Sequence, residues 1–198
     1  SLIQNLYPLN EGSIKIGETD ITYFSKESLR KRIGIVPQDA NLFTGSVLQN
    51  IAAGDLTPDI YRVQSICKRL GIESFIGEMP GGLNAFIGEA GTTLSGGEKQ
   101  QLTIARALYR DPEIIIMDEA TSSLDSMAEK HVQQTIRQEK EKGKTIIIIA
   151  HRLSTVMLAD TIALLQKGQL KEQGSHKELL KLRGTYFELW KKQHLIGY

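Results

Sequence analysis

Two adjacent carboxylates, Asp118 and Glu119, follow the apolar run Ile114 to Met117. An uninterrupted apolar run of this length predicts a buried strand, so the acids are expected where a strand ends. Carboxylates at such a position hold magnesium or orient water beside a phosphate in enzymes of phosphoryl transfer. The alternative is that the two acids only cap a strand end on the surface, as such pairs often do. The pair therefore raises the question of where a phosphate would be held.

A phosphate loop needs the pattern G-x-x-x-x-G-K-[ST] between a strand and a helix, because backbone N–H groups and a helix N-terminus must converge on the anion. Gly143, Lys144 and Thr145 give the one candidate ending in the sequence. Gln138 stands where the first glycine is needed, and the expected order there is helix and then strand. We therefore interpret Gly143 as the C-terminal cap of a helix.

A second group with possible chemistry is LSGGEKQ, Leu94 to Gln100. Ser95, Gly96 and Gly97 open an expected helix, so a hydroxyl, two unhindered backbone amides and the positive end of the helix dipole lie together and can bind an anion. The alternative is an ordinary serine cap, with Glu98 completing a capping box. Both interpretations can hold at once.

Composition limits the remaining possibilities. The 198 residues suffice for one sizeable core with a grafted lobe. Lys and Arg total 24 against 23 for Asp and Glu, a net charge of +1, so no nucleic-acid partner is expected. The lone Cys67 cannot form an internal disulfide, which favours a reducing, cytosolic setting. We interpret Cys67 as a core thiol on a helix face and not as a nucleophile.

The order of elements predicts the fold class. Short strands are expected over 12–17 and 21–24, followed by a helix capped by Ser25 and a strand ending near Pro37. Short helices separated by Gly and Pro then form an inserted lobe. After Leu94, helices alternate with continuous apolar strands, which favours an α/β fold with a mainly parallel sheet covered by helices on both faces. A small antiparallel part includes a hairpin with Lys167 and Gly168 at its turn.

The motifs occur in one order: VPQ, LSGGEKQ, the acid pair, SSLD and a lone His151 after a strand. In this order they resemble the nucleotide-binding domain of ABC transporters, the ATP-binding cassette family, over essentially all 198 residues. The resemblance implies a P-loop NTPase-like, RecA-like α/β core over 1–38 and 106–198 and a helical lobe over 39–105. In that family the Walker A phosphate loop precedes the segment that resembles LIQNLYPLNEGSI. The resemblance therefore implies a partial, truncated domain that is inactive by itself.

The same resemblance implies a role for each candidate residue. Asp118 corresponds to the magnesium-site acid and Glu119 to the general base that orients water. His151 is expected to contact the γ-phosphate and to link it to Glu119, although a lone histidine is more often structural. Gln38 is expected to ligate magnesium and to sense the γ-phosphate, the alternative being an ordinary turn after Pro37. The other histidines are expected on polar helix surfaces: His131, His176 and His194.

Partners and cofactors also follow from the resemblance. Members of the family close two domains head to tail around two ATP molecules with Mg²⁺, so a second nucleotide-binding domain, as a homodimer, is expected. Ser95, Gly96, Gly97 and Glu98 would bind ATP held by the second copy, and Asp125, at the end of SSLD, would report across the interface. Transmembrane domains would place the protein at the cytoplasmic face of the cell membrane, as part of a transporter.

Further likenesses refine the expected class. Glu89 and Gly91, just before LSGGE, and the segment 41–51 resemble exporters more than importers. The stretch MPGGLNAFIGEAG resembles exporters of peptides and bacteriocins. Two alternatives are a soluble ABC ATPase acting on DNA or ribosomes, without transport, and an inert binding or dimerisation module. Several long apolar spans upstream would decide for a transporter.

Overall fold

The computed structural model describes residues 2–91, 93–121, 123–150 and 153–195. It divides into two compact units, 1–149 and 150–198, which are described separately. Within the described ranges, no helix combines the length and the apolar character needed to span a bilayer.

The first unit is built on a parallel three-stranded sheet. Its strands are β3 (Ile33–Val36), β6 (Ile114–Asp118) and β7 (Thr145–Ile149), in the order β3-β6-β7. Asp118 pairs with Ile149, so β6 and β7 end together. Because all three strands run in the same direction, their carboxyl ends meet at one edge, where ligands bind in open α/β folds. The α/β class and the parallel strands predicted from the sequence are confirmed.

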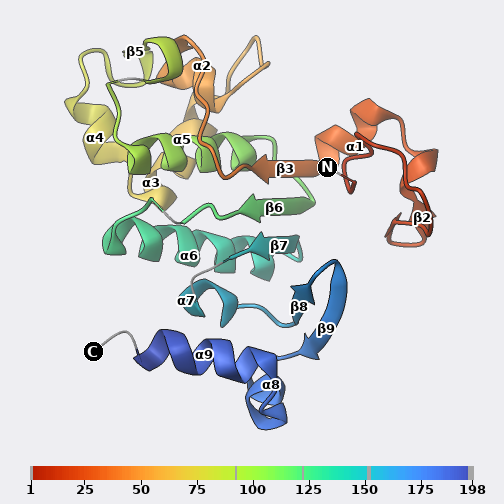
Figure 1. Ribbon diagram of the computed structural model, residues 1–198. Coiled ribbons are helices and arrows are strands. Elements are labelled where there is room, and N and C mark those ends of the chain that lie inside the picture. Colours follow the sequence, from red (N-terminus) through yellow and green to blue (C-terminus); the bar gives the residue numbers. More distant parts are fainter. Residues whose placement is uncertain (1, 92, 122, 151–152, 196–198) are drawn as a thin grey trace. The chain divides into compact units, whose positions relative to one another are not determined.

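Two long helices accompany this sheet: α5 (Gly96–Tyr109) packs against β3, and α6 (Ser126–Glu141) packs against β7 (Figure 1). Their inward sides are fully buried at Leu102, Ala105 and Val132. Burial of such apolar side chains contributes about 25 cal/mol per Å² removed from water, so it fixes both helices firmly on the sheet. The two helices therefore carry any side chains at their ends in defined positions.

Short helices fill the inserted lobe, as expected, and α2 (Val47–Ile51) and α3 (Ile60–Leu70) pack against α5. Cys67 lies inside α3 and is 3% exposed, and burial raises its pKa to about 12, which confirms a core thiol. One two-residue strand pair was not predicted: β4 (Gly45–Ser46) is antiparallel to β5 (Phe86–Ile87). The helical elements are α2 (Val47–Ile51), α3 (Ile60–Leu70), α4 (Glu73–Glu78) and the 3-10 helices Gly82–Asn84 and Glu89–Gly91.

The N-terminal part contains β1 (Lys15–Ile16) and β2 (Thr19–Asp20), which form an antiparallel pair. The prediction of a strand over 21–24 is wrong, because Ile21–Tyr23 forms a 3-10 helix. The carboxylate of Asp20 accepts a hydrogen bond of 2.9 Å from the backbone N–H of Thr22 and turns the chain. The next helix, α1 (Lys26–Arg32), begins after its predicted cap, Ser25.

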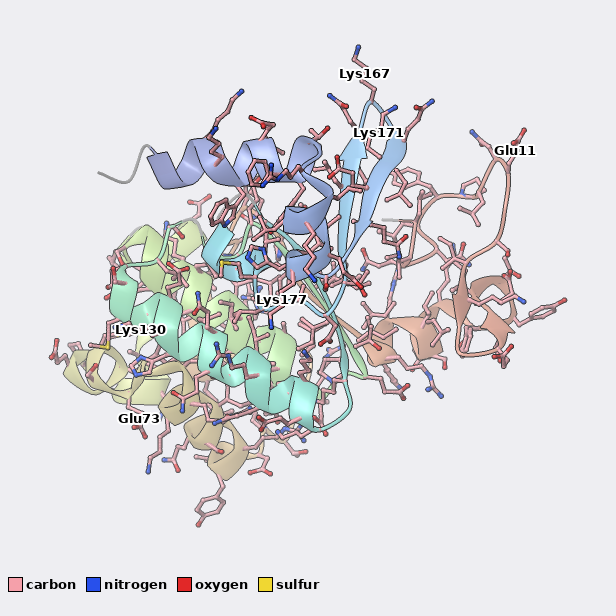
Figure 2. The ribbon with its side chains drawn as sticks, turned by 90° about the horizontal axis from the view of Figure 1, so that it is seen from below. Glu11, Glu73, Lys130, Lys167, Lys171 and Lys177 are labelled. Atoms are coloured by element: carbon pink, nitrogen blue, oxygen red, sulfur yellow. The ribbon has the colours of Figure 1, made fainter. Side chains whose placement is uncertain are left out.

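The second unit contains the predicted hairpin. Lys167 and Gly168 have φ values of 52° and 74°, which matches a two-residue turn, and Lys167 and Lys171 extend from the hairpin in Figure 2. His176 is half-buried, and its Nδ1 lies 2.8 Å from the hydroxyl of Tyr186, so its expected place on the surface is corrected. The elements are α7 (Leu153–Val156), β8 (Ile162–Gln166), β9 (Gln169–Gly174), α8 (His176–Leu182) and α9 (Thr185–Leu195).

Candidate active site

Glu119 stands directly after β6 with a left-handed backbone, φ 48°. Its backbone N–H donates to the carbonyl oxygen of Ile149 at 2.9 Å, which holds the turn against the end of β7. A left-handed conformation costs a non-glycine residue about 1–3 kcal/mol and is found preferentially at functional sites. The backbone is therefore strained at the residue that the sequence marks as the base.

Gln38 meets Glu119 across the sheet edge. It lies two residues beyond the end of β3, and its Nε2 donates to Oε2 of Glu119 at 3.1 Å. The two residues come together because Val36 pairs with Met117, so both strands deliver the chain to the same edge. A neutral amide thus orients the carboxylate without adding a charge beside it.

Asp118 is the last residue of β6 and is half-buried at the same edge. Magnesium prefers oxygen donors and is usually held by one or two carboxylates together with waters and substrate phosphates. Asp118 offers a carboxylate, and Gln38, whose Nε2 donates to Glu119, retains an amide oxygen. These donors fit magnesium, although the described residues hold no cluster of three or more His, Cys, Asp or Glu side chains suited to a metal. His151 lies outside the described residues.

The LSGGE segment forms the first turn of α5. Ser95 is the N-cap, and its Oγ accepts from the N–H of Glu98 at 3.2 Å. The Glu98 carboxylate accepts in return from the N–H of Ser95 at 2.7 Å. This reciprocal pair is the capping box that the sequence predicted. Gly96 and Gly97 follow at the positive end of the helix dipole, where backbone amides favour an anion.

The first turn of α5 packs on the loop that precedes α6. A methyl group at Gly97 would lie 3.3 Å from the carbonyl oxygen of Ser123, so the helix approaches this loop closely. Asp125 ends the loop as the N-cap of α6 and accepts from the N–H groups of Met127 and Ala128 at 2.9 and 2.8 Å. Within this chain, the Asp125 carboxylate therefore fixes the start of α6.

A hollow of about 470 Å³ opens between the first turns of α5 and α6 and the turn joining α3 to α4. This volume lies in the range of small-molecule sites, about 300–1,000 Å³. Ser95, Gly96, Gly97, Glu98 and Asp125, which the sequence singled out, all line it.

His131 also lines this hollow and is half-buried, which corrects its expected place on a plain polar surface. A methyl group at Gly71 would lie 2.3 Å from Nδ1 of His131, so the imidazole needs the glycine. Helical spacing could have revealed this, because residues 127, 128 and 131 share one face of α6.

Comparison with known proteins gives a consistent picture. A family model described as "ABC transporter" matches residues 1–122. The heterocyst differentiation ATP-binding protein HepA of Nostoc sp. is 41% identical over 99% of this chain and 32% of that protein. The mitochondrial iron-sulfur clusters transporter atm1 of Aspergillus fumigatus is 42% identical over 98% of this chain and 27% of its own length. The ATP-dependent lipid A-core flippase of Legionella pneumophila is 42% identical over 98% of this chain and 33% of its own length.

A solved structure described as a bacterial Atm1-family ABC exporter with ATP bound superimposes with a TM-score of 0.92 and 42% sequence identity. The match covers 98% of this chain and 34% of that chain. The chain thus spans about a third or less of these relatives. The expected likeness to exporters is confirmed, and the narrower likeness to peptide and bacteriocin exporters stays a prediction.

Proposed function

Because the chain belongs to the ABC transporter family, we propose that it is the nucleotide-binding domain of an exporter and hydrolyses ATP with Mg²⁺ to drive transport. The observation that carries this proposal is the hydrogen bond of 3.1 Å between Gln38 and Glu119, at the strand ends beside Asp118. It joins the predicted sensor to the predicted base over 81 residues of sequence. The relatives named as a transporter and as a lipid A-core flippase favour this function over a DNA- or ribosome-associated ATPase.

In the proposed reaction, water attacks the γ-phosphorus of ATP, and the bond between that phosphorus and the β–γ bridging oxygen breaks. ADP leaves with the bond electrons, and inorganic phosphate forms. Glu119 orients the water and accepts its proton on a carboxylate oxygen, while Gln38 holds that carboxylate. Asp118 and the amide oxygen of Gln38 would hold magnesium, which when bound neutralises charge on the phosphate oxygens. His151 is proposed to contact the γ-phosphate.

The α5 side of the molecule is proposed to complete the site of a second copy. Ser95, Gly96, Gly97 and Glu98 border an open hollow, so the Ser95 hydroxyl and the backbone amides of Gly96 and Gly97 can bind the phosphates of ATP held by a head-to-tail partner. Asp125 would lie at the same interface. A homodimer of such domains, joined to transmembrane domains at the cytoplasmic face of a membrane, is the proposed assembly.

The 198-residue chain alone is proposed to bind MgATP weakly. Its sequence contains no phosphate loop in a usable order, since Gly143 and Lys144 follow helix α6 and precede strand β7. Catalysis therefore needs phosphate-binding groups beyond these residues. Tight stoichiometric MgATP binding by the monomeric chain would contradict this part of the proposal.

The test is steady-state MgATP hydrolysis by the complete protein in lipid vesicles, compared with its Glu119→Gln variant. Glu113→Gln is the matched control, because Glu113 lies directly before the same strand β6 that Glu119 follows, but forms an exposed pair with Arg32. Hydrolysis that disappears with Glu119→Gln and persists with Glu113→Gln supports the proposal. Hydrolysis that does not depend on Glu119 overturns it.

A further inference from the structure

Helix α5 connects the Ser95 turn to other parts of the first unit. The amide of Gln100, in its second turn, donates to the carbonyl oxygen of Pro37 at 3.4 Å, directly before Gln38. Farther along, Leu102 and Ala105 are completely buried. A continuous helix that is packed in this way moves as one body. Whatever is attached to its last turns therefore follows its first turn.

Arg106, in the last turn of α5, forms hydrogen bonds with the segment 41–50. Its Nη1 donates to the carbonyl oxygen of Asn41 at 2.9 Å, and its Nε donates to the carbonyl oxygen of Asn50 at 2.7 Å. Its Nη2 donates to Oδ1 of Asn50 at 2.8 Å. The guanidinium also lies 5.1 Å from the centre of the Phe43 ring. Only the planar, five-donor fork of arginine makes these contacts simultaneously.

The segment gripped by Arg106 is itself folded around one buried side chain. Asn50 is 0% exposed, and its Oδ1 accepts from the N–H of Phe43 at 3.1 Å. Its Nδ2 donates to the carbonyl oxygens of Phe43 and Ser46 at 2.9 and 3.1 Å. The segment thus behaves as one unit, and Arg106 attaches that unit to α5.

We propose that Arg106 is a positioning residue that makes the segment 41–50 follow α5, so that MgATP bound at the Ser95 end changes the segment around Phe43. This inference rests on the proposed function, in which the Ser95 turn contacts ATP held by a second copy. Phe43 is 44% exposed and Phe86, on the adjoining strand β5, is 70% exposed, so apolar rings lie on the surface beside this segment. Arg106 makes nucleotide occupancy detectable at that surface.

The experiment is hydrogen–deuterium exchange on the complete protein carrying Glu119→Gln, with and without MgATP. The readouts are the amides of 95–100 and of 43–50, where Phe43 donates to Asn50 and Val47 donates to Ala85 at 3.0 Å. In this parent protein, MgATP is expected to slow exchange in both segments. If Arg106 only stabilised the fold, replacing it would change the exchange rates equally with and without MgATP. If Arg106 positions the segment, replacing it should reduce the difference that MgATP makes at 43–50.

Arg106→Lys keeps the charge but cannot occupy all three acceptors. Protection by MgATP at 95–100 is expected to remain, while the MgATP-dependent slowing at 43–50 becomes about tenfold weaker, the effect of about one lost hydrogen bond. The matched control is Arg110→Lys, one helical turn away. Arg110 donates to the carbonyl oxygen of Ala53 at 2.7 Å, a bond that lysine can also make, so this variant should respond like the parent.

Full MgATP-dependent slowing at 43–50 in Arg106→Lys would overturn the inference, as would its absence in the parent. Absence of protection at 95–100 in the parent would overturn the proposed function instead. If Arg106→Lys does not fold, Phe43→Leu decides. It removes the ring beneath the guanidinium and keeps the hydrogen bonds, so the slowing should weaken about threefold. An unchanged response in Phe43→Leu would then contradict the role of Arg106.

Discussion

Two glutamates of the first unit show how differently one kind of side chain is held near the two ends of β7. Glu119, at the ligand edge of the sheet, is half-buried, has a strained backbone and meets the neutral amide of Gln38. Glu139, near the far end of α6, is 1% exposed and forms ion pairs with three cations. These cations are Arg69, Lys142 and Lys144.

The comparison separates a carboxylate that stabilises the fold from one that we propose takes part in catalysis. Burial raises the pKa of Glu139, but hydrogen bonds from Lys142, Lys144 and Arg69 lower it by more, so that the pKa is about 2. Such a group stays ionised and cannot exchange protons near neutral pH. Glu119 is instead positioned by its backbone and by the neutral amide of Gln38.

Replacing Glu119 should give the largest effect on hydrolysis. Glu119→Gln removes the proton acceptor and keeps the shape, so MgATP hydrolysis by the complete protein should fall about 10²- to 10⁴-fold. The free energy of unfolding should change little, because the residue is half-buried. Rapid-quench hydrolysis assays and chemical denaturation measure the two quantities. A variant that keeps more than a tenth of the rate would remove the distinction between the two glutamates.

Replacing the structural carboxylate should have the opposite pattern. Glu139→Gln leaves three cations without their shared partner and should cost about 3 kcal/mol of unfolding free energy, as when a buried ion pair loses one member. Hydrolysis per folded molecule should stay close to that of the wild type. Glu27→Gln is the control, because Glu27 pairs with Lys31 on the surface and such pairs contribute about 0–1 kcal/mol. Equal losses in both variants would contradict the special role of Glu139.

Acid should weaken the structural carboxylate in a defined range. The pKa of Glu139 is about 2 in the folded chain against an ordinary value of 4.5, so its stabilisation is complete above pH 4.5 and is lost as the pH falls toward 2. Between pH 6 and pH 3 the loss should be about 2 kcal/mol. Urea titrations of the wild type and of Glu139→Gln at several pH values measure it, and the variant should show a shallower dependence. Parallel pH curves would refute the assignment.

The turn beside Glu139 should give the smallest effect. Gly143 has φ 82° with open space around it, so Gly143→Ala adds strain without a clash and should cost about 1 kcal/mol. Gly77→Ala is the matched control, because Gly77 lies inside α4 with ordinary φ and open space, and alanine should stabilise that helix. Thermal denaturation of both variants checks the sign. Stabilisation by Gly143→Ala would show that the glycine is not needed for the turn.

The strand ends that carry the candidate site were largely predictable, because the sequence patterns that mark them are local or occur in a fixed order. The apolar run before Asp118 indicated β6, and the pattern S-G-G-E indicated the capping box of Ser95, which the structure confirms. Gly143 directly follows Lys142, the C-cap of α6, with φ 82°, which confirms it as the left-handed glycine that ends the helix. The proximity of Gln38 to Glu119 follows from parallel strands that end at one edge.

Other features depend on tertiary contacts that leave little trace in the sequence. Glu139 lies in the charged run QEKEKGK, which is typical of a solvated surface, yet it is buried where Arg69 of α3 meets α6. The β4–β5 pair has two residues per strand, too few to show a period of two. At Ile21 the side chain of Asp20 outweighs the β-propensity of the residues after it.

The hydrogen bond between Gln38 and Glu119 also has a consequence for folding kinetics. The two residues are 81 positions apart, and the inserted lobe lies between them. Contacts of such long sequence separation are expected to form late, because closing the loop between them costs conformational entropy before the contact contributes any stabilisation. A nascent or partly folded chain is therefore expected to bring Gln38 and Glu119 together only after the segment between them has compacted. In the proposed function, ATP hydrolysis would therefore begin only after this contact has formed, a delay set by the connectivity of the chain.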